Sequence, residues 1–126
     1  MKKVKVNTPN APQAIGSYEQ AVKIGNLVYT SGQIPLKADG TLVGECIKEQ
    51  TTQVMQNLKA VLEASGSGLD KVVKATIFLK DISEFKVVDE VYSSFFDGDF
   101  PARSCVEVAR LPKDVRVEIE VIALAN

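Results

Sequence analysis

Any catalysis by this chain has to proceed without histidine. None of its 126 residues is a histidine, which excludes Ser-His-Asp triads, Cys-His dyads, histidine-ligated metals and the paired-histidine mechanism of many ribonucleases. Arg103, at the end of the segment Phe100-Pro101-Ala102-Arg103, is the first candidate for chemistry. Its guanidinium matches a carboxylate or phosphate in two parallel, charge-assisted hydrogen bonds. We expect Arg103 to hold a substrate anion, although one charged residue on a half-solvated sheet is often only a surface residue.

Other polar residues have structural explanations that compete with functional ones. Cys105 is either a nucleophile activated by the neighbouring arginine or a packed thiol whose backbone N–H matters more than its sulfur. Tyr18 is either a half-buried aromatic residue or a hydroxyl that faces a ligand. Gly32 either relieves a bulge or permits a close approach of the backbone. The glutamate-rich last strand offers a carboxylate that can orient or deprotonate water.

Hydrophobic periodicity predicts the elements that position these residues. The expected elements are a β-hairpin over residues 19–34, a helix over 45–65, a strand over 73–80, a helix from Ser83 to about Phe96, and strands over 104–109 and 115–125. Gly25-Asn26 suits a two-residue type II′ turn in the hairpin. Gly66 suits the end of the first helix, and Ser83 is the expected cap of the second.

Strand alternation predicts which polar residues share a face. The two groups are Arg103, Cys105 and Glu107 on one strand, and Arg116, Glu118 and Glu120 on the other. We expect these strands to be neighbours that form a C-terminal hairpin, with polar groups along one side. The whole pattern predicts a single α+β domain over residues 1–126, in the order β-β-α-β-α-β-β, with two helices on one face of a mixed sheet.

Composition excludes several other classes of protein. A net charge of -1 and a pI near 5.5 argue against a nucleic-acid-binding surface. No apolar run approaches the roughly 18 residues of a membrane span, and no signal peptide is evident. Cys46 and Cys105 are too few for a disulfide framework. We therefore expect a cytoplasmic protein with reduced thiols.

Five ordered motifs make the chain similar, over essentially its whole length, to the RidA/YjgF family of imine and enamine deaminases, once called endoribonucleases or translation inhibitors. The motifs are APQAIGSYEQAV, YTSGQIP, EQTTQVMQNLKAVLEASG, VVKATIFLKDISEF and FPARSCVEVARLPKDVRVEIEVIAL. This resemblance implies a chorismate-mutase-like α+β fold that assembles as a homotrimer with clefts between subunits. It also implies small-molecule chemistry with no metal or organic cofactor.

The resemblance implies a role for each site residue. It makes Arg103 the clamp for the substrate carboxylate, with the backbone amides of Cys105 and Gly32 beside it. It makes Glu118 the residue that positions the attacking water. Tyr18 and Ser31 are then residues that line the pocket, and Phe85 comes from the adjacent subunit. The implied substrates are 2-imino acids such as 2-iminobutanoate and 2-iminopropanoate, which are hydrolysed to 2-keto acids and ammonia. Such imines are already good electrophiles, so histidine is not needed.

Three positions depart from the usual family pattern, and two other functions stay open. Ser17 stands where proline is usual, Asp89 stands where many members have asparagine, and the loop 97–99 is shorter than usual. These departures concern substrate range and trimer contacts. The first alternative is a regulatory trimer that binds keto acids without turnover. The second is a ribonuclease, which the missing histidine and the mildly acidic charge support poorly.

Overall fold

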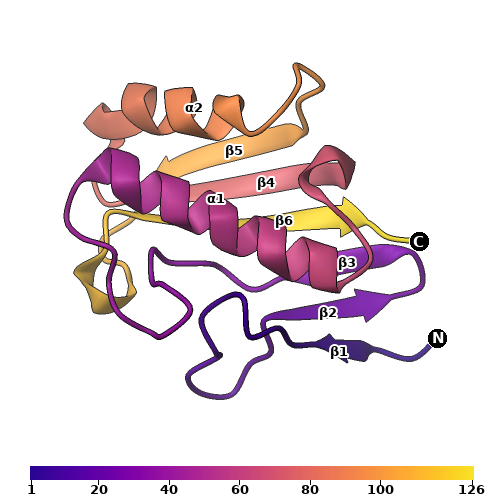
Figure 1. The fold of residues 1–126 in the computed structure, drawn as a ribbon. Coiled ribbons are helices and arrows are strands. Elements are labelled where there is room, and N and C mark those ends of the chain that lie inside the picture. The colour runs from indigo at the N-terminus through magenta and orange to yellow at the C-terminus, as the bar shows by residue number, and fades with distance from the viewer.

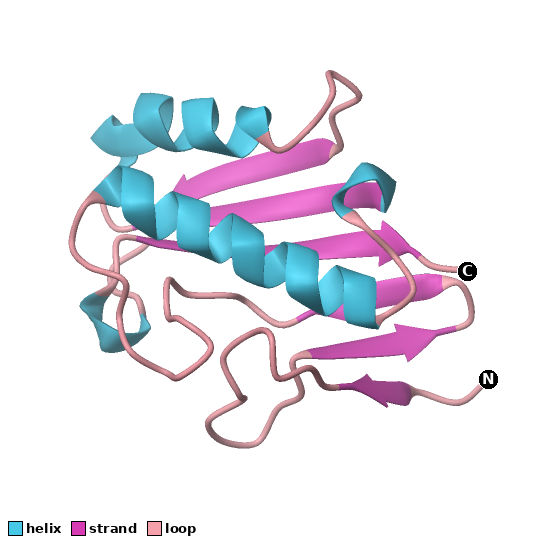
Figure 2. Ribbon diagram, viewed as in Figure 1, coloured by secondary structure: helices cyan, strands magenta, loops and turns pink.

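Two helices cover one face of a six-stranded mixed sheet (Figures 1 and 2). The structure, a computed structural model, describes all residues from 1 to 126. The strands are β1 (Val4–Val6), β2 (Ala21–Ile24), β3 (Leu27–Thr30), β4 (Val72–Leu79), β5 (Ala102–Glu107) and β6 (Val117–Leu124), and the helices are α1 (Ile47–Ala64) and α2 (Phe85–Ser94). The strand order is β1-β2-β3-β6-β4-β5. This arrangement confirms the predicted α+β class.

The N-terminal hairpin forms as predicted. Ile24 pairs with Leu27 across a two-residue turn, and Gly25 has a φ of 57° at the first central position, which a type II′ turn requires. The structure adds β1, which pairs antiparallel with β2 and forms one edge of the sheet. Its three residues are too few to show a period in the sequence.

The predicted C-terminal hairpin is wrong, because β4 lies between β5 and β6. β5 runs parallel to β4, as the crossover through α2 requires, whereas β6 is antiparallel to both β3 and β4. Burial explains the order. β6 buries every second residue, from Val117 to Ala123, and takes a central position, whereas all residues of β5 remain at least partly exposed, as suits an edge strand.

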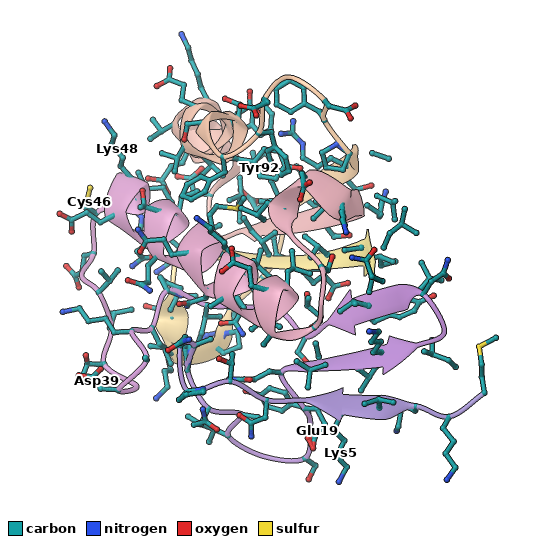
Figure 3. All side chains as sticks on the ribbon, turned by 45° about the vertical axis from the view of Figure 1, so that its right-hand side comes forward. Lys5, Glu19, Asp39, Cys46, Lys48 and Tyr92 are labelled. Atoms are coloured by element: carbon teal, nitrogen blue, oxygen red, sulfur yellow. The ribbon has the colours of Figure 1, made fainter.

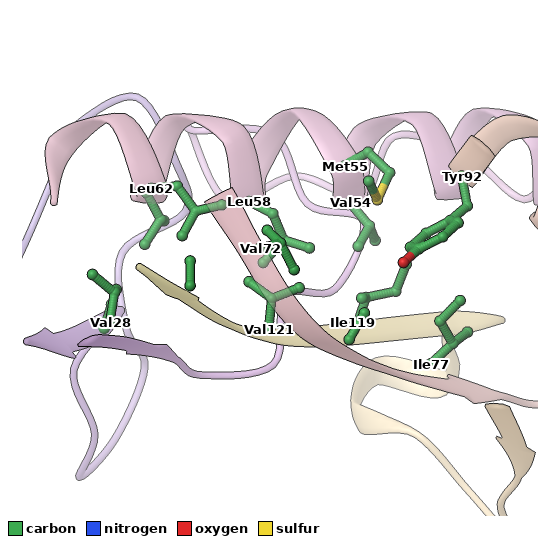
Figure 4. Packing of buried hydrophobic residues seen from close by; sticks show 14 of the residues in the cluster. Val28, Val54, Met55, Leu58, Leu62, Val72, Ile77, Tyr92, Ile119 and Val121 are labelled. Carbon is green, nitrogen blue, oxygen red and sulfur yellow. The ribbon is translucent and has the colours of Figure 1, made fainter. Parts of the chain in front are cut away.

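Helix α1 supplies much of the core. Val54, Leu58, Val61 and Leu62 recur at helical spacing and are fully buried against the sheet. Figure 4 shows Val54, Leu58 and Leu62 on the side of the helix that faces Val28 and Val121. The helix ends as predicted, with Gly66 at a φ of 75°. Neither helix is long and apolar enough to cross a membrane.

The predicted Ser83 cap of the second helix is wrong. Asp81 instead caps the turn that precedes this helix, since its carboxylate accepts hydrogen bonds from the backbone N–H and the hydroxyl of Ser83, at 2.9 and 2.7 Å. A short 3-10 turn follows, and α2 begins only at Phe85. Aspartate is as good a capping residue as serine, so local sequence left either possible.

One residue of β4 also differs from the predicted alternation. Val73 is 42% exposed, although strict alternation over 73–80 would place it on the core face with the buried Ala75, Ile77 and Leu79. The pairing with β6 shifts register between Val72 and Lys74, so a bulge there turns Val73 outward and leaves Val72 buried. From Ala75 onward the predicted alternation holds.

Candidate active site

A cavity of about 600 Å³ collects four of the predicted site residues. Tyr18, Ser31, Gly32 and Glu118 all line it. The walls come from the loop before β2, the segment that follows β3, the turn before β6, and β6 itself. The sequence therefore brings together residues that are up to 100 positions apart at one end of the sheet.

Glu118 projects into this cavity from the sheet face that the helices leave uncovered. Its neighbour Ile119 is fully buried in the core, so alternation along β6 directs Glu118 to the other side. Burial raises the pKa of the Glu118 carboxyl above its usual value, and the nearby negative charge of Glu120 raises it further. A carboxyl with a raised pKa is suited to exchange protons near neutral pH.

Gly32 and Glu118 are in close contact. A Cβ atom at Gly32 would overlap Oε2 of Glu118 and would lie 2.8 Å from its Cδ. The predicted close approach of the backbone at Gly32 is therefore present, and its partner is the carboxylate of Glu118. The Gly32 N–H donates no hydrogen bond to another protein group, so it is free to bind a ligand.

Hydrogen bonds fix the other side of the cavity. The Ser31 hydroxyl donates to the Glu19 carbonyl at 2.5 Å, which leaves its oxygen only as an acceptor. The Tyr18 hydroxyl accepts a bond from the Ile15 N–H at 3.2 Å, and the side chain is 49% exposed. Sequence reasoning missed Gln20, whose buried amide donates to the carbonyls of the loop from Thr8 to Pro12 and so anchors the segment that carries Tyr18.

Arg103 lies outside this cavity. On β5 it pairs in register with Ala75, whose side chain belongs to the core beneath the helices. Nη1 of Arg103 donates to Oδ1 of Asp89 on α2 at 2.6 Å. The guanidinium carbon lies 5.1 Å from the ring centroids of both Phe85 and Tyr92. Arg103 thus lies between two aromatic rings of α2 and lines a second cavity of about 380 Å³.

Cys105 lies on the same face, two residues along β5. It pairs with the fully buried Ile77 and is partly buried against the core. Burial raises the pKa of the Cys105 thiol, and the positive charge of Arg103 opposes this only in part. The thiol is therefore uncharged near neutral pH, as a packed cysteine would be.

The backbone N–H of Cys105 points toward the free edge of the sheet. Val108 N donates to Leu79 O of β4 at 3.0 Å, and backbone groups of an edge strand alternate between the paired and the unpaired side. Cys105 is an odd number of residues from Val108, so its N–H belongs to the unpaired set and is available to a ligand.

The predicted site residues therefore form two groups on opposite faces of one sheet. Arg103, Cys105 and Phe85 lie on the helix-covered side, and the two cavities share no lining residue. The expectation that polar residues of neighbouring strands share one side is wrong. Within the chain, the Gly32 amide is not beside Arg103, and Phe85 contacts Arg103 from the same subunit.

The remaining charges of the two strands have structural roles. Arg116 donates to the Glu84 carboxylate and to the Glu45 carbonyl. Glu107 accepts from the Ile82 N–H at 3.0 Å. No cluster of three or more Cys, Asp or Glu side chains is arranged to hold a metal ion.

A family model, relatives by sequence and solved structures all match this chain over most of its length. The model of the family described as endoribonuclease L-PSP matches residues 8–125. A protein of Salmonella typhimurium named 2-iminobutanoate/2-iminopropanoate deaminase is 49% identical over 122 residues, which cover 94% of this chain and 95% of the relative. YyfA of Yersinia pestis, whose structure is described as that of a Rid family protein, is 48% identical with a TM-score of 0.96 over 98% of this chain and 100% of its own. TdcF of E. coli, solved with bound serine, is 42% identical with a TM-score of 0.92 over 97% and 98% of the two chains.

Proposed function

The chain belongs to the endoribonuclease L-PSP family, the RidA/YjgF family that its motifs resemble, and from this membership we propose that it is a 2-imino acid deaminase. It hydrolyses 2-iminobutanoate and 2-iminopropanoate to the corresponding 2-keto acids and ammonia. Relatives with about half of their residues identical carry that activity in their names. A relative with the same fold was solved with serine, which presents the same α-carboxylate as a 2-imino acid.

The position and the raised pKa of the Glu118 carboxyl are the main support for the proposed reaction. This carboxyl is partly buried in a cavity of suitable size, and its pKa is raised. In the proposed reaction the Glu118 carboxylate takes a proton from water as the water oxygen bonds to the imine carbon. The carbinolamine receives that proton on nitrogen, and its hydroxyl proton passes to the Glu118 carboxylate as the C=O bond forms, the C–N bond breaks and ammonia leaves. The same carboxyl can take and return the proton because its pKa lies closer to neutrality.

Arg103 binds the carboxylate of the imine in this proposal. Its Nε and Nη2 have no acceptor in the chain, so a fork of two donors remains for a carboxylate. The Cys105 N–H at the sheet edge and the free Gly32 N–H add further donors. Tyr18 and Ser31 line the reaction space.

The split of the site between two faces supports a homotrimer. One chain cannot bring Arg103 and Glu118 to the same small molecule, because the sheet separates them. A second copy can bring its Glu118 cavity to the Arg103 edge of the first, and a cyclic assembly repeats this contact at every boundary. In this arrangement Phe85 and Arg103 come from the same subunit. Glu118 comes from the other subunit, so Phe85 belongs to the subunit adjacent to the one that supplies Glu118.

The test is a rate measurement on freshly formed imine. An amino-acid oxidase generates 2-iminopropanoate from alanine, and keto acid release is followed with and without the protein. We expect acceleration by the wild type and by the surface control Glu90→Gln, and none by Arg103→Ala or Glu118→Gln. Keto acid binding without acceleration would instead identify a regulatory protein. Equal rates for the wild type and Arg103→Ala would refute the assigned clamp.

A further inference from the structure

Asp89 already accepts a hydrogen bond from Nη1 of Arg103, the arginine proposed to bind the substrate. Its Oδ1 accepts from Nη1 of Arg103 at 2.6 Å, and the two side chains are 43% and 25% exposed. This pair is the only hydrogen bond that the guanidinium makes within the chain. An incoming carboxylate must therefore bind beside a resident carboxylate.

Asp89 is not the only group that contacts the Arg103 guanidinium. Phe85, Asp89 and Tyr92 recur at helical spacing, so they share one face of α2. Tyr92 is almost fully buried, and Figure 3 shows it beneath this helix. The Phe85 and Tyr92 rings are equally close to the guanidinium, one turn to either side of Asp89. Both rings contact the guanidinium from α2, and Asp89 adds a negative charge between them.

The cavity around this pair offers an anion no second positive charge. It is lined by Asp89, Tyr92, Ser93, Phe100, Pro101 and Arg103. Arg103 is the only cation in that lining, and the other residues apart from Asp89 are uncharged. A ligand with one carboxylate shares the guanidinium with Asp89. A ligand with two carboxylates would bring a third negative charge to one positive charge.

We propose that Asp89 determines the ligand selectivity of this site by favouring ligands with a single carboxylate. This inference rests on the proposed function, since it concerns the same clamp. The Asp89 carboxylate competes for Nη1 and leaves Nε and Nη2 as the binding edge. It weakens the hold on every carboxylate, and it repels a second carboxylate most strongly. Specificity of this kind comes from repulsion of the wrong ligand.

The test compares two keto acids with the same five-carbon chain, 2-oxopentanoate and 2-oxoglutarate. Isothermal titration calorimetry measures both Kd values for the wild type, Asp89→Asn and Glu90→Gln. Glu90 is the matched control, because it is exposed on the same helix and its substitution removes the same charge. We expect Asp89→Asn to tighten 2-oxopentanoate by about two- to fivefold, the range of a partly exposed ion pair. We expect 2-oxoglutarate to tighten by about tenfold or more, and Glu90→Gln to change neither.

Two results would overturn the inference. Unchanged or weaker binding of both ligands by Asp89→Asn, with an unchanged thermal unfolding midpoint, would make Asp89 a support for Arg103. Equal tightening of both ligands would remove its role in selectivity. The proposed function fails separately. A wild type that does not accelerate keto acid release from the imine would refute the deaminase, whereas the binding shifts expected for Asp89→Asn would still establish the role of Asp89.

Discussion

Arg103 and Glu118 project from opposite faces of the same sheet. Between their strands lies β4, in which Ala75 pairs with Arg103 and Phe78 pairs with Glu118. Paired residues share a face and successive residues alternate, so the odd separation of Ala75 and Phe78 places the two charged residues on different sides. A single chain therefore carries the two halves of the proposed site in positions where they cannot meet.

Complementation tests this division directly. Arg103→Ala and Glu118→Ala should each be inactive alone, whereas co-refolding equal amounts into the proposed homotrimer should recover about a quarter of the wild-type rate. Each mixed trimer has one boundary with both functional residues, and about three quarters of statistically assembled trimers are mixed. The readout is keto acid release from 2-iminopropanoate. A mixture of Arg103→Ala with the double variant is the control and should stay inactive; recovery there, or its absence in the first mixture, would rule out an intersubunit site.

Gly32→Ala should lower kcat by about 10²-fold, because the new methyl group displaces the Glu118 carboxylate with which it would overlap. The fold should survive, since Gly32 has no positive φ. Gly40→Ala is the control: a Cβ there meets nothing within 4 Å, so only strain at its φ of 89° affects it. Steady-state kinetics with thermal unfolding separates the two effects. Full activity of Gly32→Ala would show that the position of Glu118 does not limit the reaction.

The acid limb of the pH–rate profile should reflect Glu118. The proposed reaction requires the carboxylate, and burial together with Glu120 raises the pKa of Glu118 above 4.5. The rate should therefore fall at a higher pH than for an ordinary carboxyl as the solution is acidified. Glu120→Gln removes the second cause and should move that limb to lower pH. An identical profile for Glu120→Gln would exclude coupling between these two carboxyls.

The raised pKa of Glu118 should also make the fold less stable as the pH rises. A carboxyl whose pKa is raised in the folded state binds more protons when folded, so its contribution to stability declines as pH rises through the window between the unfolded and folded pKa values. Glu118→Gln should therefore unfold at a higher temperature than the wild type at pH 7, with a smaller difference near pH 4. Calorimetry at the two pH values measures this. A lower melting temperature at pH 7 would contradict it.

Cys105→Ala should retain kcat within about threefold, because an uncharged, partly buried thiol is a poor nucleophile and the substitution preserves the backbone N–H. The measurement is imine turnover before and after treatment with iodoacetamide. Loss of turnover in Cys105→Ala at an unchanged melting temperature would revive the nucleophile hypothesis.

Leu58→Ala should destabilise the fold by about 2–5 kcal/mol, because the side chain is fully buried between α1 and the sheet (Figure 4). Leu42→Ala is the matched control at a side chain that is 41% exposed, and it should change stability by no more than about 0.5 kcal/mol. Urea denaturation gives both values. Similar losses in the two variants would contradict the assigned core.

Features that depend on neighbours along the chain were predictable from the sequence. The period of α1, the Gly25-Asn26 turn, the alternation within β6 and the absence of histidine are local properties, and five ordered motifs were enough to identify the family. The N-cap at Asp81 and the bulge at Val73 show where even local patterns allowed more than one solution.

Only the tertiary structure decided which strands are neighbours. β4 lies between β5 and β6. The sequence does not predict this order, because the period of a single strand does not specify which strand pairs with it, and burial and the parallel crossover depend on contacts between distant parts of the chain. That placement put Arg103 under α2, brought Asp89 to its guanidinium and left Glu118 on the other face. The candidate residues could be identified individually from the sequence, whereas the distances between them depend on the order of strands in the sheet.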